Sequence, residues 1–279
     1  MSTHVEVLDV VAQMKAAERA FVLATVVRTV SVTAAKAGAK AIIAADGTIV
    51  AGWIGGGCAR GAVLKAAHDA LADGEPRMVS VQPENLLAEL GVKPGESRDG
   101  VRFASNLCPS KGTMDIFVEP VLPHPSLVIL GASPVALSLA AQARTLGYHV
   151  TLAAPSADLT VQPDADVVID GYMLGALGEA KRFVVVSTQG KGDEAALRAA
   201  VATKADYHAF VGSRRKMVSL RAKLIGEGAD TAAVDRIKAP AGLDLGAITP
   251  EQIAMSILAE ITLERRRGQR AVNQKSSTE

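Results

Sequence analysis

The chain has 279 residues, of which 49% are hydrophobic and only 3% are aromatic, and its formal net charge is +1. This length allows two domains, whose cores must be built mainly from Ala, Val, Leu and Ile. The balanced charge gives no field that would attract nucleic acid or a membrane surface. The start carries Glu6 and Asp9 and lacks a basic-then-apolar pattern, so we expect no signal peptide. With two cysteines and no secretion signal, we expect a cytoplasmic protein without a disulfide framework.

The first 120 residues mix predicted helices and strands. Apolar residues at helical spacing predict a helix over 4–17 and a second one from 59 to about 71, which Gly74 ends. Asp46-Gly47 between two apolar runs predicts a hairpin. The predicted strands are 21–30, 39–45, 48–54, 77–81, 101–105 and 113–118. This part is therefore expected to be an α+β domain over 1–120.

Prolines at 120, 123 and 125 mark a domain boundary, with a linker over 121–125. Beyond it, apolar strands alternate with helices, which predicts a doubly wound parallel sheet, a Rossmann-like α/β domain over 126–266. The expected strands are 127–130, 149–153, 166–169, 183–187 and 208–211, and the helices are one ending at 146, 193–202 and 213–225. A last helix opens at Thr249-Pro250-Glu251-Gln252 and is expected to end near 265–267, before a mobile tail over 267–279.

A run of three glycines, Gly55-Gly56-Gly57, joins an apolar run to the second helix, and Cys58 stands where that helix begins. Glycines here permit close approach of a ligand. Helix amides and the helix dipole favour negative charge, so a thiol at this place should ionise below its usual pKa of about 8.5. The loop could bind an anion, present a thiolate, or do both. The competing interpretation is a tight turn with a small buried cysteine.

The second cysteine, Cys108, lies in a loop before a predicted strand. Two neighbouring thiols could form a soft ligand site or a redox pair. The five histidines are scattered, so no metal site is expected. The common hydrolase and phosphotransferase motifs are missing from the sequence.

The first loop of the second domain, Gly131-x-Ser133-x-x-Ala136, is a damaged dinucleotide fingerprint. Ser133 replaces the glycine that lets the backbone approach a pyrophosphate, and Pro134 removes an amide donor. The second strand has no acidic residue at its end for a ribose hydroxyl. NAD or NADP bound in the usual way is therefore disfavoured.

Another loop, Gly212-Ser213-Arg214-Arg215-Lys216, places three cations in the first turn of a helix that Ser213 is expected to cap. The dipole makes each exposed cation there unfavourable by roughly 0.3–1 kcal/mol, so an anionic ligand nearby would explain them. The alternative is an internal ion pair, with Asp244 or Glu251. In the preceding loop, Thr188 could reach a ligand and Asp193 is expected to cap the following helix.

Taken together, these motifs resemble the XdhC/CoxI family of molybdenum hydroxylase maturation factors. In the first domain the resemblance rests on Gly38-Ala39-Lys40, the hairpin, the Gly55–Cys58 loop, Cys108 and the stretch 117–120. In the second domain it rests on the Gly131 loop, the Gly212–Lys216 loop and the stretches 239–246 and 249–260.

The resemblance implies a protein that binds the molybdenum cofactor, as molybdopterin or its cytosine dinucleotide form. Such a protein supports sulfuration by a cysteine desulfurase and delivers the cofactor to an apo molybdenum hydroxylase of the xanthine or carbon monoxide dehydrogenase type. A homodimer, and a cofactor chaperone rather than a catalyst, are expected. Cys58 would relay sulfur or act as a soft ligand. Expected cofactor contacts are Gly55, Gly56, Gly57, Cys58, Arg60, Cys108, Gly131, Ser133, Thr188, Ser213, Arg214, Arg215 and Lys216.

The sequence departs from the family pattern in three places. Arg60 stands where Glu is usual, Ala34-Ala35-Lys36 replaces a Pro-Arg pattern, and Gln189 replaces a histidine. Two other functions stay open: an NAD(P)-dependent oxidoreductase using the second domain, and a thiol redox or sulfur-carrier protein.

Overall fold

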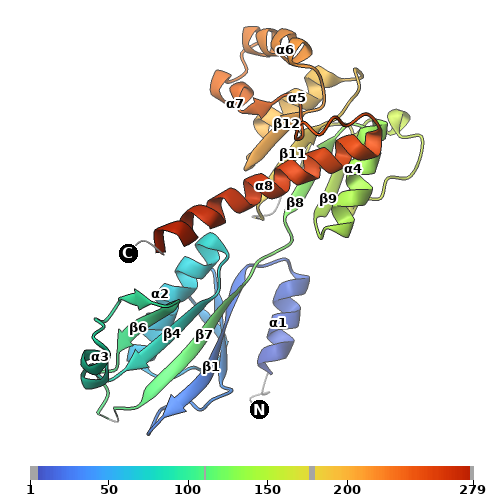
Figure 1. Cartoon of the computed structure of the whole chain (residues 1–279). Coiled ribbons are helices and arrows are strands. Elements are labelled where there is room, and N and C mark those ends of the chain that lie inside the picture. The colour runs from blue at the N-terminus through green and yellow to red at the C-terminus, as the bar shows by residue number, and fades with distance from the viewer. Residues whose placement is uncertain (1–5, 110, 176–179, 277–279) are drawn as a thin grey trace. The chain divides into compact units, whose positions relative to one another are not determined.

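The computed structural model describes residues 6–109, 111–175 and 180–276, without the side chains of residue 58 and of residues 266–276. The chain divides into two compact units, Met1–Pro123 and His124–Glu279 (Figure 1). The division falls inside the stretch 121–125 expected to be a linker. Each unit is a mixed helix-and-sheet structure, and the second has the predicted Rossmann-type parallel sheet.

The first unit is built on a seven-stranded sheet in the order β3-β2-β1-β7-β4-β6-β5. Neighbouring strands are antiparallel except for β4 and β6, which are parallel. The strands are β1 (Phe21–Val30), β2 (Lys40–Ala44), β3 (Ile49–Gly52), β4 (Arg77–Gln82), β5 (Ser97–Arg98), β6 (Val101–Ser105) and β7 (Thr113–Val121).

The alternation of apolar residues along β1 distributes its side chains over the two faces of this sheet. Val22, Ala24 and Val26 belong to a core with the helix α2 (Gly57–Asp73). Phe21 belongs to a smaller cluster with the helix α1 (Val7–Ala16). The helix predicted over 4–17 is therefore confirmed for its described part, since residues 4 and 5 lie outside the described residues.

The predicted turns form as expected. In the hairpin, Gly47 has a φ of +82°, and the amide of Thr48 donates to a carboxylate oxygen of Asp46 at 2.9 Å. Gly74 ends α2 in the left-handed conformation. The short helix α3 (Glu84–Leu90) and strand β5 were not predicted.

The second unit contains a six-stranded sheet in the order β10-β9-β8-β11-β12-β13, with all strands parallel. The strands are β8 (Ser126–Leu130), β9 (His149–Ala154), β10 (Val167–Asp170), β11 (Arg182–Val186), β12 (Tyr207–Phe210) and β13 (Ile237–Lys238). The chain order reverses between β8 and β11, and in such sheets ligands bind outside the carboxyl ends of strands at this reversal.

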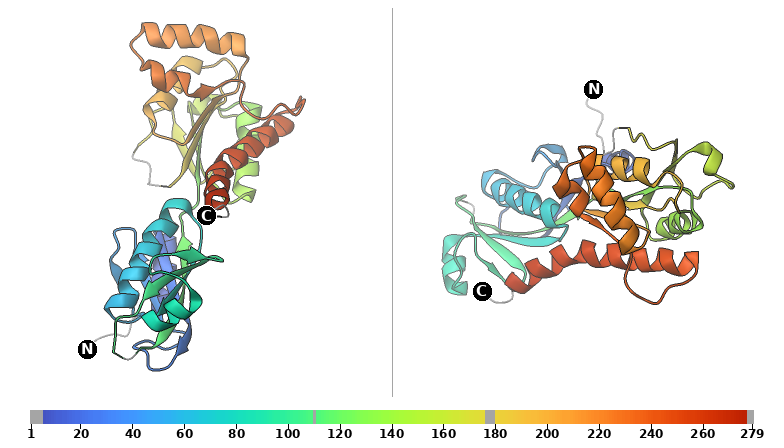
Figure 2. Two further views of the ribbon diagram at one scale, coloured as in Figure 1. Left: turned by 60° about the vertical axis from the view of Figure 1, so that its left-hand side comes forward. Right: turned by 90° about the horizontal axis from the view of Figure 1, so that it is seen from above.

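Helices cover both faces of this sheet (Figure 2). Leu127 and Ile129 of β8 pack in a core with α4 (Pro134–Thr145) and α8 (Pro250–Ser276). Val128 and Leu130 pack in the opposite core with α5 (Asp193–Ala202), α6 (Arg214–Gly226) and α7 (Thr231–Asp235). Burial on both faces explains why these strands read as continuous apolar runs.

The last helix begins as predicted but does not end as predicted. The hydroxyl of Thr249 accepts from the amide of Gln252 at 3.4 Å, and the Gln252 side chain accepts from the amide of Thr249 at 3.3 Å. The expectation of a tail from 267 was wrong, because α8 continues to Ser276. Among the described residues, no helix combines the length and the apolar character needed to cross a bilayer.

Candidate functional site

A pocket of about 250 Å³ in the first unit brings together three segments that are distant in the sequence. They are the turn after β1, the glycine loop that opens α2, and the loop between β6 and β7, and Val81 of β4 and Met114 of β7 complete the lining. The residues that line the pocket are Thr33, Ala34, Gly56, Gly57, Ala59, Val81, Asn106, Leu107, Cys108 and Met114.

The glycine loop forms one wall of this pocket. Gly55 has a φ of +117°, and a Cβ there would lie 3.1 Å from Cε of Met114, so the position suits glycine alone. α2 starts at Gly57 after an N-cap at Gly56, and no side chain caps it. A Cβ at Gly56 or Gly57 would meet nothing within 4 Å. The glycines thus leave this wall free of side chains, and the first amides of α2 have no side-chain cap, an arrangement typical of anion sites at helix starts.

The loop that carries Cys108 is organised by Asn106. Its carboxamide oxygen accepts from the amide of Cys108 at 3.0 Å, and its NH₂ group donates to the carbonyl of Gly112 at 2.6 Å. At Gly112 itself a Cβ would lie 2.3 Å from the carbonyl oxygen of Val32, so the turn after β1 packs directly against this loop. These contacts hold Cys108, which is exposed, at the pocket.

The structure thus brings together Gly56, Gly57 and Cys108 from the predicted set. Gly55 lies behind them against Met114, and the backbone of Cys58 lies between Gly57 and Ala59, both of which line the pocket. Arg60 is exposed and is not among the lining residues.

Sequence reasoning did not assign Asn106, Thr33 or Met114 to the site. An Asn two residues before Cys108 is the usual pattern of a side chain that bonds its own loop, and this signal could have identified Asn106. Thr33 directly precedes the Ala34-Ala35-Lys36 departure from the family pattern, but no sequence motif assigned it to a site, and nothing in the sequence marked Met114.

In the second unit, the loops at the reversal of strand order contact each other directly. The hydroxyls of Ser133 and Ser187 share a hydrogen bond at 2.7 Å, and Ser133 also accepts from the amide of Ala136 at 3.2 Å. A Cβ at Gly131 would lie 2.2 Å from the carbonyl oxygen of Ser187. Gly131 and Ser133 thus have structural roles within the protein at the place where a dinucleotide pyrophosphate would sit.

Three further residues of this region belong to one internal network. Lys216 forms an ion pair with Asp193 at 2.5 Å, and the hydroxyl of Thr188 donates to the same carboxylate. Burial raises the pKa of Asp193, but the bonds from Lys216 and Thr188 outweigh it and leave that pKa below its usual value. The internal ion pair that was the alternative explanation for this loop therefore exists, but the partner is Asp193 instead of Asp244 or Glu251. Asp193 also does not cap α5, since the N-cap is Gly192.

The start of α6 leaves two cations exposed. Ser213 caps the helix as predicted, because its hydroxyl accepts from the amide of Lys216 at 3.2 Å. Arg214 and Arg215 are exposed, and no ion pair to another described residue is formed by either. They are the members of this predicted group that remain available to a ligand.

The family stretch 239–246 is held by a buried carboxylate. Glu260 accepts from the amide of Gly242 at 2.8 Å and also contacts the hydroxyl of Tyr207 and the ammonium group of Lys238. A Cβ at Gly242 would lie 2.3 Å from the hydroxyl of Ser256. These contacts give Gly242 of the stretch 239–246 and Glu260 of the stretch 249–260 structural roles within the second unit.

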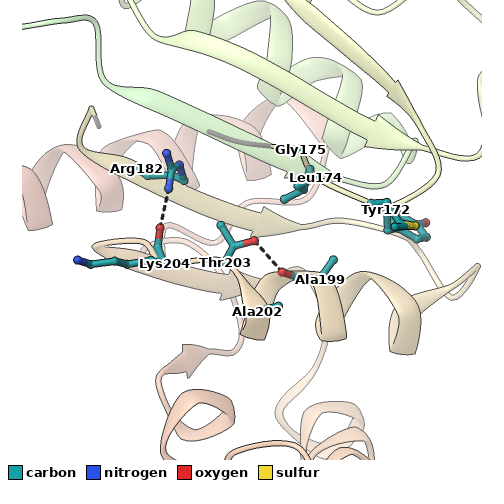
Figure 3. Close-up of a pocket in the computed structure, with 9 residues that line it drawn as sticks. Tyr172, Leu174, Gly175, Arg182, Ala199, Ala202, Thr203 and Lys204 are labelled. Atoms are coloured by element: carbon teal, nitrogen blue, oxygen red, sulfur yellow. Dashed lines mark hydrogen bonds between the residues drawn. The ribbon is translucent and has the colours of Figure 1, made fainter. Parts of the chain in front are cut away.

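A pocket of about 370 Å³ lies along α5 and the start of β11 (Figure 3). In it, Arg182 donates to the carbonyl of Lys204 at 2.9 Å, and Thr203 donates to the carbonyl of Ala199 at 2.7 Å. None of its lining residues belongs to the predicted set. Arg182 and Thr203 thus bond the backbone of the same unit, which indicates a structural role for these two side chains.

Comparison with known proteins gives matches to both units. A family model described as "XdhC Rossmann domain" matches residues 127–261, and one described as "XdhC and CoxI family" matches residues 14–82. The second match ends before Cys108. Among curated proteins, the chain is 29% identical over 231 residues to YqeB of Escherichia coli (strain K12), covering 80% of this chain and 40% of that protein.

It is 28% identical over 163 residues to a probable xanthine dehydrogenase subunit of Bacillus subtilis (strain 168), covering 56% of this chain and 47% of that protein. The chain thus spans less than half the length of both relatives. A solved structure titled as a xanthine dehydrogenase of Bacillus halodurans is 18% identical, with a TM-score of 0.43 and coverage of 94% and 96% of the two chains. The two family models, which match residues in both units, show that the chain belongs to the XdhC/CoxI family.

Proposed function

We propose that this chain is an accessory protein in the maturation of a molybdenum hydroxylase, and that it binds the molybdenum cofactor at the pocket of the first unit. Family membership supports the maturation role. The convergence of the glycine loop and the Cys108 loop on one pocket is the observation that supports the location.

The lining residues fit such a cofactor, which carries a metal–dithiolene group and a phosphate. Cys108 supplies a thiol and Met114 a thioether, and both are soft donors suited to a metal–sulfur group. The first amides of α2, which no side chain caps, suit negative charge. Bound there, the cofactor would supply the metal–sulfur chemistry of the client hydroxylase.

The protein's own residues would hold and orient this group. Asn106 fixes the main chain at Cys108, and Gly56 and Gly57 keep one wall free of side chains. The apolar side chains of Val81, Leu107 and Met114 would exclude water from the bound face. In this proposal a cysteine desulfurase provides sulfur through Cys58 or Cys108, and an apo-hydroxylase takes the finished cofactor.

The test uses two variants of the same helix. Gly57→Leu places a side chain in the pocket wall, whereas Gly61→Leu places it on α2 outside the lining set, and neither added Cβ meets another atom within 4 Å. We expect Gly57→Leu to lose at least about 90% of cofactor retention on size-exclusion chromatography, a tenfold effect of about 1.4 kcal/mol. Gly61→Leu should retain the wild-type amount. Equal retention by both variants would show that the cofactor binds elsewhere.

A thiol redox or sulfur-carrier function is the second candidate, because the backbone of Cys58 and the Cys108 loop meet at one pocket. Mass spectrometry of the protein purified without reductant separates the two. A persulfide or a Cys58–Cys108 bond in cofactor-free protein that never takes up cofactor would favour this second function.

A further inference from the structure

The pocket is lined by neutral residues alone, as far as the described part of the chain shows. No Lys, Arg, Asp or Glu is among its lining residues. Of its polar side chains, the hydroxyl of Thr33 donates to the carbonyl of Ala35 at 2.7 Å. Both ends of the Asn106 carboxamide bond to its own loop. The pocket therefore combines apolar walls and sulfur atoms with the amides at the start of α2.

This combination suits the metal–sulfur end of the proposed cofactor much better than its phosphate end. A phosphate is a compact, strongly hydrated dianion, and burying it without a cation costs several kcal/mol. The start of a helix offers only about half a positive charge. On a metal–sulfur group the charge is spread over large sulfur atoms, and the cost of removing an ion from water falls as its radius grows. Thiol and thioether donors also match soft metal centres.

We propose that this pocket is selective for soft, sulfur-ligated metal anions and admits the metal–sulfur end of its ligand, while the phosphate end stays outside. The inference rests on the proposed function for the identity of the full ligand. It assigns selectivity to Cys108, Met114 and the uncharged position at Ala34.

The turn after β1 carries the feature specific to this chain. Ala34 lines the pocket and is exposed, and it belongs to the stretch Ala34-Ala35-Lys36 that replaces the Pro-Arg pattern of the family. Ala34 and Ala35 supply no cation to this wall, and Lys36, which is exposed, is not among the lining residues. Placing a cation at Ala34 should relax the selectivity toward hard oxyanions.

Two ions that differ only in their ligand atoms give a direct test. Tetrathiomolybdate and molybdate share metal, shape and charge, and differ in having sulfur or oxygen around the metal. Equilibrium dialysis of the full chain against each ion, with bound molybdenum measured by plasma mass spectrometry, gives both affinities. Inorganic phosphate is added in parallel samples as a competitor.

We expect tetrathiomolybdate to bind at least about tenfold more tightly than molybdate, and Cys108→Ser to remove most of that preference. Phosphate should not displace it. Ala34→Arg should raise molybdate affinity about tenfold, whereas Ala37→Arg, at an exposed position outside the lining set, should leave it unchanged. Circular dichroism shows that each variant is folded.

Equal affinity for the two ions, displacement by phosphate, or an unchanged preference in Cys108→Ser would overturn the inference. If one of these results is found but the protein still retains the cofactor on size-exclusion chromatography, the proposed function stands and only the proposed orientation of the cofactor is wrong. If the protein shows the expected ion preference but never retains the cofactor, the proposed function is wrong and the proposed selectivity of the pocket stands.

Discussion

At the scale of single residues, the amide side chain of Asn106 is the organiser of the candidate site. It accepts from the amide of Cys108 and donates to the carbonyl of Gly112, so one side chain closes the loop between β6 and β7. A side chain that hydrogen-bonds two backbone groups contributes more to stability than its buried area alone would give, because its removal leaves both groups without these partners.

We expect Asn106→Ala to destabilise the first unit by about 1–3 kcal/mol and to change the rate at which Cys108 reacts with iodoacetamide. Asn106→Asp keeps the acceptor for Cys108 and loses the donor to Gly112, so its effect should be intermediate. Denaturant titration and peptide mass spectrometry measure the two quantities. Equal stability of all three proteins would mean that the loop does not depend on this side chain.

His208 gives a pH dependence at the same scale. It is buried on β12, and a ring nitrogen lies 2.9 Å from the carbonyl of Thr203. Burial lowers the pKa of His208, and the Thr203 hydrogen bond opposes this only in part. The unfolded chain, with a histidine pKa of about 6.5, therefore takes up a proton at a higher pH than the folded chain.

The free energy of unfolding should consequently fall as the pH drops below about 6.5. This loss of stability should level off below the lowered pKa of His208 in the folded protein. His208→Gln removes this component. As the pH is lowered from 8 to 5, the unfolding free energy of the wild type should decrease relative to that of His208→Gln. A difference independent of pH would contradict the assignment.

At the scale of elements, the strength of the sequence signal decided what could be predicted. The strand β1, the continuous apolar run of β8 and the capped start of α8 were predicted because each has a clear apolar pattern or capping residues. The short α3, β5, α7 and β13 contain too few residues to show an apolar period. The end of α8 was missed because residues 267–276 are polar, so nothing in their pattern distinguishes a helix from a tail.

The loops at the carboxyl ends of β11 and β12 show why site residues were harder to predict. The cations at the start of α6 were visible in the sequence, but the partner of Lys216 was not, because Asp193 lies at the start of α5, earlier in the chain. Only the pairing of β11 with β12 brings the two together. A pattern of charges shows that a partner is needed, and the fold decides which residue it is.

Lys216→Met should therefore destabilise the second unit by about 1–2 kcal/mol, because it leaves the carboxylate of Asp193 without its cation in a largely buried place. Arg214→Met and Arg215→Met, at exposed positions on the same helix turn, should change stability by less than about 0.5 kcal/mol. Thermal unfolding compares the three. Equal effects would argue against the Lys216–Asp193 pair.

At the scale of the whole molecule, each unit has its own hydrophobic core and its own sheet. The family resemblance implied two domains, and the proline cluster predicted a boundary within 121–125. The meeting of the glycine loop and Cys108 could not be derived from spacing, because it depends on how β1, β7 and β6 are ordered in the sheet.

Because every lining residue of the candidate site belongs to the first unit, residues 1–123 expressed alone should fold and keep the ion preference of the full chain. Far-ultraviolet circular dichroism and equilibrium dialysis with tetrathiomolybdate test both points. A fragment that folds but shows no preference would place necessary residues in the second unit.

The pocket is assembled from three segments around residues 33, 56 and 107, which only the completed sheet brings together. An unfolded or half-paired first unit therefore offers no site, and any occupant of the pocket must stabilise the folded form by mass action. Calorimetry of the full chain should then show a ligand-dependent unfolding temperature for one transition and a ligand-independent one for the other. Occupancy would be reported by the thermal resistance of a single unit, so a cell that degrades unfolded chains would preferentially retain loaded ones.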